Sequence, residues 1–283
     1  MMLFQAAGVT SRGCVKDTNQ DSFLIQVAHT DFGDVALVAV ADGMGGLEKG
    51  ELASATVVRA LSNWFQEKLP LSLEAMGTSI DGFESFVQGQ WNGLVQDLNL
   101  NIMRYGQSCG VKLGTTVTAM LTIGARYSIV HVGDSRAYEI TNEKIHQLTE
   151  DQTYIKREVD AGRMTPEEAL THPDRNVLLQ CVGSSKEVTP SIIHGTLVKG
   201  AHYLLCSDGF RHVLNESEMQ TMFLPSKLED AWIQTKCENG AFSYPVVEEA
   251  LSDVIDLVMK RKERDNITAV LLKVKGVDGY GTF

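Results

Sequence analysis

Apolar residues follow two different spacings along the chain, and the change of spacing separates expected strands from expected helices. Strand-like runs occupy residues 4–10, 23–27 and 35–41. The last run is apolar at nearly every position, which is typical of a strand buried on both faces. Helical spacing follows over residues 51–65 and again over residues 91–102. We therefore expect two amphipathic helices that cover a sheet.

The middle of the chain returns to strand-like spacing. Between Pro70 and Gly82 the helical periodicity lapses, which predicts a loop between the two helices. Short turns separate the next four apolar runs and favour an antiparallel meander. These runs are residues 116–123, 127–132, 137–140 and 144–148.

The second half contains an irregular stretch followed by two more strands. Helical patterns at residues 152–161 and after Thr165 lie within an expected flap from Thr149 to Gly183. Strands are expected at residues 202–206 and 267–274, on either side of a helix over 246–260. Because strands are grouped with strands and helices with helices, the pattern predicts the α+β class without βαβ repeats.

Composition limits the class of protein and of partner. With 283 residues, 43% of them hydrophobic, and no linker-like segment, the chain is expected to form a single domain over residues 1–283. It carries 25 Lys and Arg against 36 Asp and Glu, a formal charge of −11. This charge disfavours nucleic acids and anionic membranes as partners. It suits a solvated acidic surface and also a site that collects divalent cations.

Cysteine usage and hydropathy bear on the compartment. The five cysteines are widely spaced and form no Cys-x-x-Cys pair, so neither a disulfide framework nor a zinc knuckle is expected. The longest strongly apolar run, residues 35–41, is far too short to cross a bilayer, and the first residues lack the pattern of a signal peptide. We expect a cytoplasmic protein without membrane insertion.

Acidic residues at the ends of the expected strands carry the chemistry. Asp42, Asp134 and Asp208 follow apolar runs directly, while Asp21 and Asp265 precede two others. A single Asp-Gly pair is more often a plain turn. Five converging carboxylates without cations would repel one another strongly, so their convergence would imply bound metal. Ligands made only of oxygen favour Mg²⁺ or Mn²⁺ over zinc.

Other catalytic patterns fail on this chain. The glycine-rich turn at residues 43–50 has Glu51 where a phosphate-binding loop needs lysine, and it breaks the dinucleotide fingerprint. The seven histidines include no His-x-x-x-His pair, and no serine stands in a Gly-x-Ser-x-Gly elbow. Nucleotide, zinc-peptidase and serine-hydrolase chemistry are therefore disfavoured.

Six short motifs, in this order, closely resemble those of the metal-dependent, type 2C protein serine/threonine phosphatases, and the methionine after Asp42-Gly43 resembles the bacterial branch. The match extends over nearly the whole chain. The motifs are Asp17-Thr18-Asn19-Gln20-Asp21, Ala41-Asp42-Gly43-Met44-Gly45-Gly46, Gly114-Thr115-Thr116, Gly133-Asp134-Ser135-Arg136, Ser207-Asp208-Gly209 and Asp265-Asn266-Ile267-Thr268. The resemblance implies two antiparallel sheets packed face to face and flanked by helices.

The resemblance also implies the role of each aspartate. Asp42 would bridge two metal ions, and the carbonyl of Gly43 would bind one of them. Asp208 and Asp265 would complete the first site, and Asp21 would hold the second ion through water. Asp134 together with Asp208 would bind a third, weaker ion.

Asn266 and Ser207 would orient these ligands. A hydroxide bridging two Mn²⁺ or Mg²⁺ ions would attack phosphoserine or phosphothreonine in proteins.

Several positions depart from the family pattern. Lys16 stands where relatives have the arginine that grips phosphate, and a lysine cannot form the bidentate fork. Met44 replaces a histidine of many eukaryotic relatives, which leaves the general acid unassigned. Gln152 stands where relatives often carry histidine. Residues 223–248 form a longer segment than the family needs, and Glu263-Arg264 replaces glycines.

Two functional hypotheses follow from these motifs. The first is a monomeric phosphatase whose substrates are phosphorylated Ser/Thr proteins, including a serine/threonine kinase, and which opposes bacterial kinases. Its catalytic residues would be Asp42, Lys16 and Asp208, and the flap would select substrates. The alternative is a catalytically impaired relative that binds phosphoproteins as a scaffold, for which Lys16 is the favouring feature.

Overall fold

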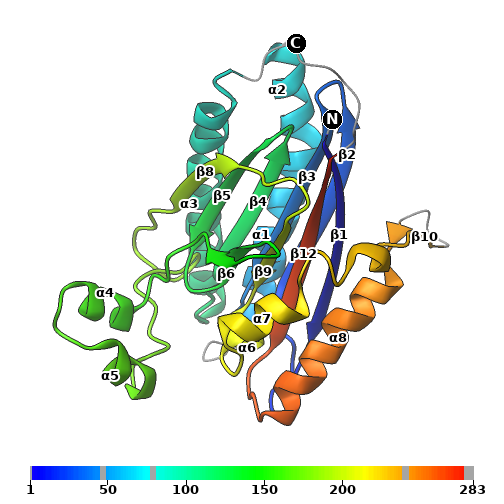
Figure 1. Cartoon of the computed structure of the whole chain (residues 1–283). Coiled ribbons are helices and arrows are strands. Elements are labelled where there is room, and N and C mark those ends of the chain that lie inside the picture. The colour runs from blue at the N-terminus through cyan, green and yellow to red at the C-terminus, as the bar shows by residue number, and fades with distance from the viewer. Residues whose placement is uncertain (1, 45–48, 77–80, 238–241, 277–283) are drawn as a thin grey trace.

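The computed structural model describes residues 2–44, 49–76, 81–237 and 242–276. Gly45 and Gly46 of the predicted turn, residues 77–80 of the predicted loop and residues 238–241 of the predicted long segment lie outside the described residues. Two five-stranded antiparallel sheets pack face to face, with helices on both outer surfaces (Figure 1). The α+β class and the layered arrangement expected from the sequence are confirmed.

The first sheet has the strand order β1-β12-β9-β6-β7 and the second has the order β2-β3-β4-β5-β8. The strands of the first sheet are β1 (Met2–Ser11), β12 (Ile267–Gly276), β9 (His202–Cys206), β6 (Arg136–Ile140) and β7 (Ile145–Gln147). Those of the second are β2 (Ser22–Thr30), β3 (Gly33–Ala41), β4 (Val117–Ile123), β5 (Arg126–Val132) and β8 (Ser191–Thr196). A separate two-stranded pair joins β10 (Thr235–Lys236) to β11 (Phe242–Ser243).

The helices form two outer layers and a projecting flap. The second sheet is covered by α1 (Gly50–Asn63), the π-helix η1 (Trp64–Lys68), α2 (Leu69–Met76) and α3 (Phe83–Cys109). The first sheet is covered by α6 (Asp208–Arg211), α7 (Glu216–Met222), the 3₁₀ turn η2 (Glu229–Ala231) and α8 (Pro245–Lys260). Figure 1 shows α4 (Tyr154–Asp160) and α5 (Pro166–Thr171) projecting away from the sheets, within the predicted flap.

Successive side chains of each strand point to opposite faces of its sheet, and this alternation divides the core into three clusters. On β3, Leu37 and Ala39 pack under the helices, whereas Val38 and Val40 pack between the sheets. This explains the continuous apolar run, because both faces of β3 are covered. None of the helices within the described residues has the length and apolar character needed to cross a membrane.

The predicted loop between Pro70 and Gly82 is wrong for its first part, because α2 occupies Leu69–Met76. The helix continues through a π-turn, in which the N–H of Leu69 bonds the carbonyl of Trp64 five residues back. A π-turn already departs from the i→i−4 pattern, so Pro70 can enter at the second position of α2 without breaking a regular bond. Trp64 and Phe65 remain buried as predicted.

The predicted four-strand meander is also wrong. Strands β4 and β5 pair in the second sheet, but β6 and β7 pair in the first. The chain crosses between sheets at Gly133, whose backbone adopts a φ of 110°. A Cβ at Gly133 would lie 2.8 Å from Cβ of Thr116. Glycine is therefore required at the crossover, which is immediately followed by Asp134.

The long segment predicted at residues 223–248 packs on the first sheet. Phe223, Trp232 and Tyr244 belong to the core cluster shared with α8. His202 Nδ1 lies 2.9 Å from the carbonyl of Phe223, and the buried Lys273 Nζ lies 3.1 Å from Glu229 Oε2. These contacts join the described part of the segment to strands β9 and β12.

Candidate metal centre

The antiparallel register brings the predicted aspartates to one end of the two sheets. Ser22 at the start of β2 pairs with Ala41 at the end of β3, so Asp21 and Asp42 are neighbours across the strands. In the other sheet Cys206, which ends β9, pairs with Ala269 near the start of β12. The same end of the molecule therefore holds the five acidic residues Asp21, Asp42, Asp134, Asp208 and Asp265.

A cavity of about 210 Å³ collects four of these aspartates. Its lining includes Asp42, Asp134, Asp208 and Asp265 together with Lys16. Met44 contributes to the wall, and Asn176 and Leu178 reach it from the flap. Asp21 is buried and lies outside this lining, close enough for its charge to act on Asp42. The structure thus brings together the residues that the sequence singled out, from segments up to 249 positions apart in the chain.

Burial and mutual repulsion raise the pKa values of three of the carboxyls. Burial is the main cause for Asp42, whose pKa lies well above the usual range, and the charges of Asp21 and Asp208 add to it. Burial raises the pKa of Asp21 to about 7, although hydrogen bonds from Thr268 and Ser207 oppose the rise. Burial and the charge of Asp208 raise the pKa of Asp134 to about 7. Such mutual repulsion is the condition that a bound cation relieves.

Two carboxylate oxygens fit a cation better than they fit a closed protein core. Asp21 Oδ1 and Asp208 Oδ1 are buried, and neither has a hydrogen-bond partner among the described residues. Unpartnered buried acceptors are costly, so they are expected to serve a ligand. In their present arrangement no three His, Cys, Asp or Glu side chains of the described segments form a group that could hold a metal ion. Asp265 faces Lys16 instead, with 2.7 Å between Nζ and Oδ1.

The turn after β3 holds its shape through the backbone. The N–H of Gly43 donates to the carbonyl of Gln20, and the N–H of Met44 donates to that of Gly114. A Cβ at Gly43 would overlap the carbonyl oxygens of Gln20 and Gly50. Only glycine fits there, as expected for a position where the backbone approaches a ligand site.

Asn266 and Ser207 support the aspartates by different routes. The side chain of Asn266 accepts from the N–H of Gln20 at 2.9 Å and donates to the carbonyls of Arg12 and Thr18. It therefore holds the loop that leads to Asp21. Ser207 accepts from the N–H of Thr268 at 3.0 Å, and its hydroxyl opposes the rise in the pKa of Asp21.

Residues outside the proposed ligand set hold the turn that carries Asp134, and two of them, Arg211 and Asp151, were not singled out from the sequence. The side-chain oxygen of Gln152 accepts a hydrogen bond from the backbone N–H of Gly133 at 2.9 Å. The backbone N–H of Gln152 donates to the carbonyl of Gly133 at 2.8 Å. On the other side, Arg211 Nη2 donates to the carbonyl of Asp134 at 2.9 Å.

Arg211 is oriented in turn by Asp151, which also forms a bidentate pair with Arg136 at 2.7 Å. The sequence signal that could have identified Arg211 is its position three residues after Asp208.

A histidine also stands beside Asp208. His212 Nε2 lies 3.5 Å from Asp208 Oδ2, and His212 Nδ1 lies 3.7 Å from Glu263 Oε2. Burial alone would lower the pKa of His212, but Glu263 and the charge of Asp208 raise it above the usual value. Glu263 Oε1 also accepts the N–H of Asp265 at 3.0 Å. Glu263, a departure from the family pattern, thus supports the segment that carries Asp265.

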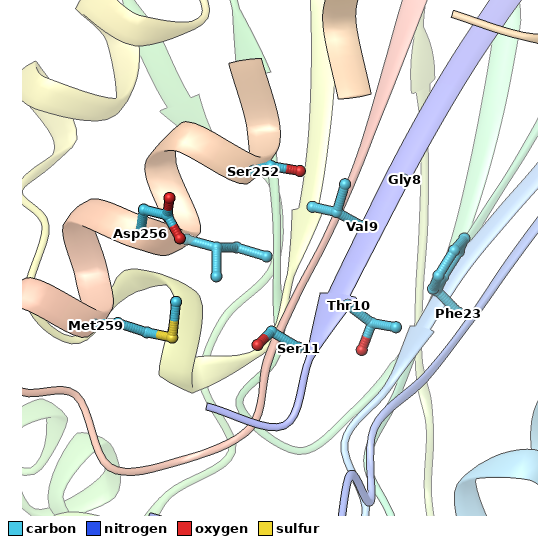
Figure 2. Close-up of a pocket in the computed structure, with 9 residues that line it drawn as sticks. Gly8, Val9, Thr10, Ser11, Phe23, Ser252, Asp256 and Met259 are labelled. Atoms are coloured by element: carbon cyan, nitrogen blue, oxygen red, sulfur yellow. The ribbon is translucent and has the colours of Figure 1, made fainter. Parts of the chain in front are cut away.

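A second cavity, of about 440 Å³, lies between β1 and α8 (Figure 2). Figure 2 shows Ser252, Asp256 and Met259 on α8, with Ser11 on the side of β1 nearer the helix and Thr10 on its other side, near Phe23. Among the described residues that line it, Asp256 is the one ionisable residue. This cavity therefore offers no constellation for phosphoryl chemistry.

Comparisons with known proteins agree with the geometry. The family model described as protein phosphatase 2C matches residues 10–252. The serine/threonine protein phosphatase PstP of Mycobacterium tuberculosis is 30% identical over 280 residues, which cover 99% of this chain and 46% of that protein. The serine/threonine phosphatase stp of Listeria monocytogenes is 31% identical over 215 residues, covering 75% of this chain and 79% of that protein. The chain spans about half the length of the PstP relatives it matches.

Solved structures show the same fold. The S. agalactiae serine/threonine phosphatase superposes with a TM-score of 0.75 at 28% identity, covering 95% of this chain and 99% of that one. The catalytic domain of PstP in complex with two manganese ions superposes with a TM-score of 0.71 at 29% identity, covering 98% and 100%. With the family model matching most of the sequence, the chain belongs to the protein phosphatase 2C family.

Proposed function

We propose that this chain hydrolyses phosphoserine and phosphothreonine in proteins, using two or three Mn²⁺ or Mg²⁺ ions held by its aspartates. The observation that carries the proposal is the cavity in which Asp42, Asp134, Asp208 and Asp265 meet Lys16. The buried, unpartnered oxygens of Asp21 and Asp208 support it as well. The crystallised PstP domain with two manganese ions makes Mn²⁺ the first ion to test.

The ligand assignment follows the position of each group. Asp42 would contact two ions, with the carbonyl of Gly43 beside it. Asp208 and Asp265 would complete one site, and Asp21 would serve another through water. Asp134 and Asp208 would hold a third ion. For Asp265 this requires that its oxygen exchange the ammonium of Lys16 for the cation.

When bound, such ions stabilise the charge on the phosphoryl oxygens and lower the pKa of water so that it attacks at neutral pH. The chain's own residues would orient and hold the reactants. Lys16, released from Asp265, would bind a phosphoryl oxygen by a charge-assisted hydrogen bond. Thr268 and Ser207 would keep Asp21 in place. Met44 lines the cavity but has no proton to donate to the leaving alkoxide.

The flap would choose the substrate. Asn176 and Leu178 reach the cavity wall from the predicted flap at residues 149–183, beside Met44. An amide and two apolar side chains at the rim suit a peptide segment around the phosphorylated residue. We also propose that the enzyme is monomeric and cytoplasmic, and that residues 1–283 form one catalytic domain. In this proposal it opposes bacterial serine/threonine kinases.

Hydrolysis assays on defined phosphopeptides test this function. The purified chain should release phosphate from phosphothreonine and phosphoserine peptides with Mn²⁺ or Mg²⁺, and release should stop in excess EDTA. Asp208→Asn should be inactive, whereas Asp253→Asn, on the exposed face of α8, should match the wild type. A wild-type chain that binds these peptides without hydrolysing them at saturating Mn²⁺ would support the scaffold alternative instead.

A further inference from the structure

A closed ring of hydrogen bonds surrounds Asp21. The N–H of Asp21 donates to Asn19 Oδ1 at 3.2 Å, and Asn19 Nδ2 donates to Thr10 Oγ1 at 2.7 Å. The hydroxyls of Thr10 and Thr268 lie 2.7 Å apart. Thr268 Oγ1 donates to Asp21 Oδ2, again at 2.7 Å. The ring thus begins at the backbone of Asp21 and returns to its carboxylate.

The direction of every bond in this ring follows from its chemistry. The Asp21 N–H can only donate, so the oxygen of the Asn19 amide faces it and the nitrogen faces Thr10. An ionised carboxylate can only accept, so the single proton of the Thr268 hydroxyl points to Asp21. The Thr10 hydroxyl must then donate to Thr268. Aligned donors of this kind polarise and strengthen one another.

The fold places these residues independently of the ring. Thr10 and Thr268 are register partners in the antiparallel pair β1–β12, so their side chains stand side by side on one face. Thr268 is fully buried, whereas Thr10 is exposed beside the cavity of Figure 2. Asn19 bonds the N–H two residues ahead, as in an Asx-turn. Three elements distant in sequence therefore converge on one carboxylate.

We propose that Asn19, Thr10 and Thr268 are positioning residues for Asp21. By holding Oδ2, the ring leaves Oδ1 available to a cation, since Oδ1 is buried and unpartnered among the described residues. The inference rests on the proposed function in that a divalent cation is the expected ligand. Groups that orient a metal-binding carboxylate commonly change metal affinity by about 10- to 100-fold when removed.

Isosteric variants test the ring through metal binding without substrate. Thr268→Val should raise the Kd for Mn²⁺, measured by calorimetric titration, by about 10-fold or more at the site that Asp21 serves. Thr10→Val, which leaves the Thr268–Asp21 bond in place, should raise it by about 3-fold. Thr268→Ser keeps the hydroxyl and should restore wild-type affinity. Thr122→Val removes a buried hydroxyl from β4, whose partner is Ala36, and should leave Mn²⁺ affinity unchanged.

The double variant shows whether Thr10 acts on Asp21 through Thr268 or whether the two substitutions only destabilise the folded chain in general. If Thr10 acts through Thr268, then adding Thr10→Val to Thr268→Val should change the Mn²⁺ affinity no further. Additive effects, a Thr268→Val affinity within about twofold of the wild type, or a wild type that binds no Mn²⁺ would overturn the inference. If the wild type is an active phosphatase and Thr268→Val binds Mn²⁺ as the wild type does, the positioning role of the ring is rejected and the proposed function stands. Ring-dependent Mn²⁺ binding without hydrolysis would reject the proposed function alone.

Discussion

The ammonium of Lys16 lies 2.7 Å from Asp265 Oδ1, at the position where a metal ligand is expected. Both side chains are about one third exposed and line the same cavity. From the sequence alone, a change at Lys16 would be expected to affect phosphate binding and to leave metal affinity untouched. The ion pair changes this expectation, because a cation at Asp265 must compete with the ammonium.

Lys16→Met should therefore have two opposite effects. The Kd for Mn²⁺ should fall several-fold because the competing charge is gone. The KM for a phosphopeptide should rise, by a factor equivalent to about 1–3 kcal/mol, because the substrate loses a charge-assisted hydrogen bond. Calorimetry and steady-state kinetics measure the two effects, with Lys144→Met as an exposed control. Unchanged Mn²⁺ affinity would show that the pair does not resist metal binding.

Asp42→Asn should stabilise the metal-free chain while weakening its response to metal. The pKa of Asp42 is raised by burial and by neighbouring carboxylates, so the folded state holds this proton more tightly than the unfolded state does. The contribution of Asp42 to stability is thus fully present below the unfolded pKa of about 3.9 and is lost as pH rises through the folded pKa.

Asparagine cannot ionise, so in EDTA at pH 8 the variant should exceed the wild type by about 1–3 kcal/mol in free energy of unfolding. The advantage should disappear near pH 4 and reverse when Mn²⁺ is added at pH 8. Urea unfolding under the three conditions measures this. A variant less stable than the wild type in EDTA at pH 8 would contradict the repulsion among the aspartates.

Acid should destabilise the chain through His131. Burial lowers the pKa of His131 to about 4. Its ring nitrogens are placed 2.9 Å from Thr118 Oγ1 and 3.0 Å from the carbonyl of Glu150. The unfolded chain takes up a proton below about pH 6.5, whereas the folded chain does not until about pH 4. Stability present above pH 6.5 is therefore lost as pH falls toward 4.

The stability difference between the wild type and His131→Gln isolates this contribution, because the aspartates titrate in both proteins. The difference should shrink by up to about 3 kcal/mol between pH 7 and pH 4. A difference that stays constant across this range in chemical unfolding would show that His131 takes up its proton equally in both states.

Trp232 should be structural rather than catalytic. Its ring packs 5.6 Å from His202 and 5.3 Å from Tyr244, measured between ring centroids, and joins residues 223–248 to the first sheet. Trp232→Ala should cost about 3–5 kcal/mol of stability. Trp232→Phe should cost less, because the indole Nε1 is buried without a partner among the described residues. At a temperature where the variants are folded, kcat should match the wild type; a large loss of kcat in Trp232→Phe would give the segment a role in catalysis.

The strand ends of the candidate site could be predicted because local patterns encode them. Apolar runs that stop at Asp42, Asp134 and Asp208 are visible within about ten residues of sequence, and the antiparallel register then brings them together. The face-to-face packing of the two sheets came from the resemblance. The positions of the strand ends and the packing of the two sheets were therefore predicted from signals that do not depend on the details of side-chain packing.

Features set by tertiary contacts could not be predicted in this way. The sheet crossover at Gly133 depends on the close approach of Thr116, and the helix through Pro70 depends on one π-turn. Strand β8 was missed because it is an edge strand of six residues with no fully buried position.

Apart from the roles expected of Asn266 and Ser207, the contacts that hold the aspartates were missed for the same reason. Thr268 and Asp21 are 247 positions apart, so no local pattern reports their hydrogen bond. The pairing of Lys16 with Asp265 likewise joins the two ends of the chain.

The central claim is that the clustered aspartates form a divalent-metal centre organised around Asp42. Equilibrium dialysis against Mn²⁺ at pH 8, followed by elemental analysis, measures the ions bound per chain. We predict two or three Mn²⁺ ions for the wild type and for Asp253→Asn, and a loss of tight binding in Asp42→Asn, since that carboxylate would contact two ions. Equal numbers of Mn²⁺ ions, bound with equal affinity by the wild type and Asp42→Asn, would contradict the account.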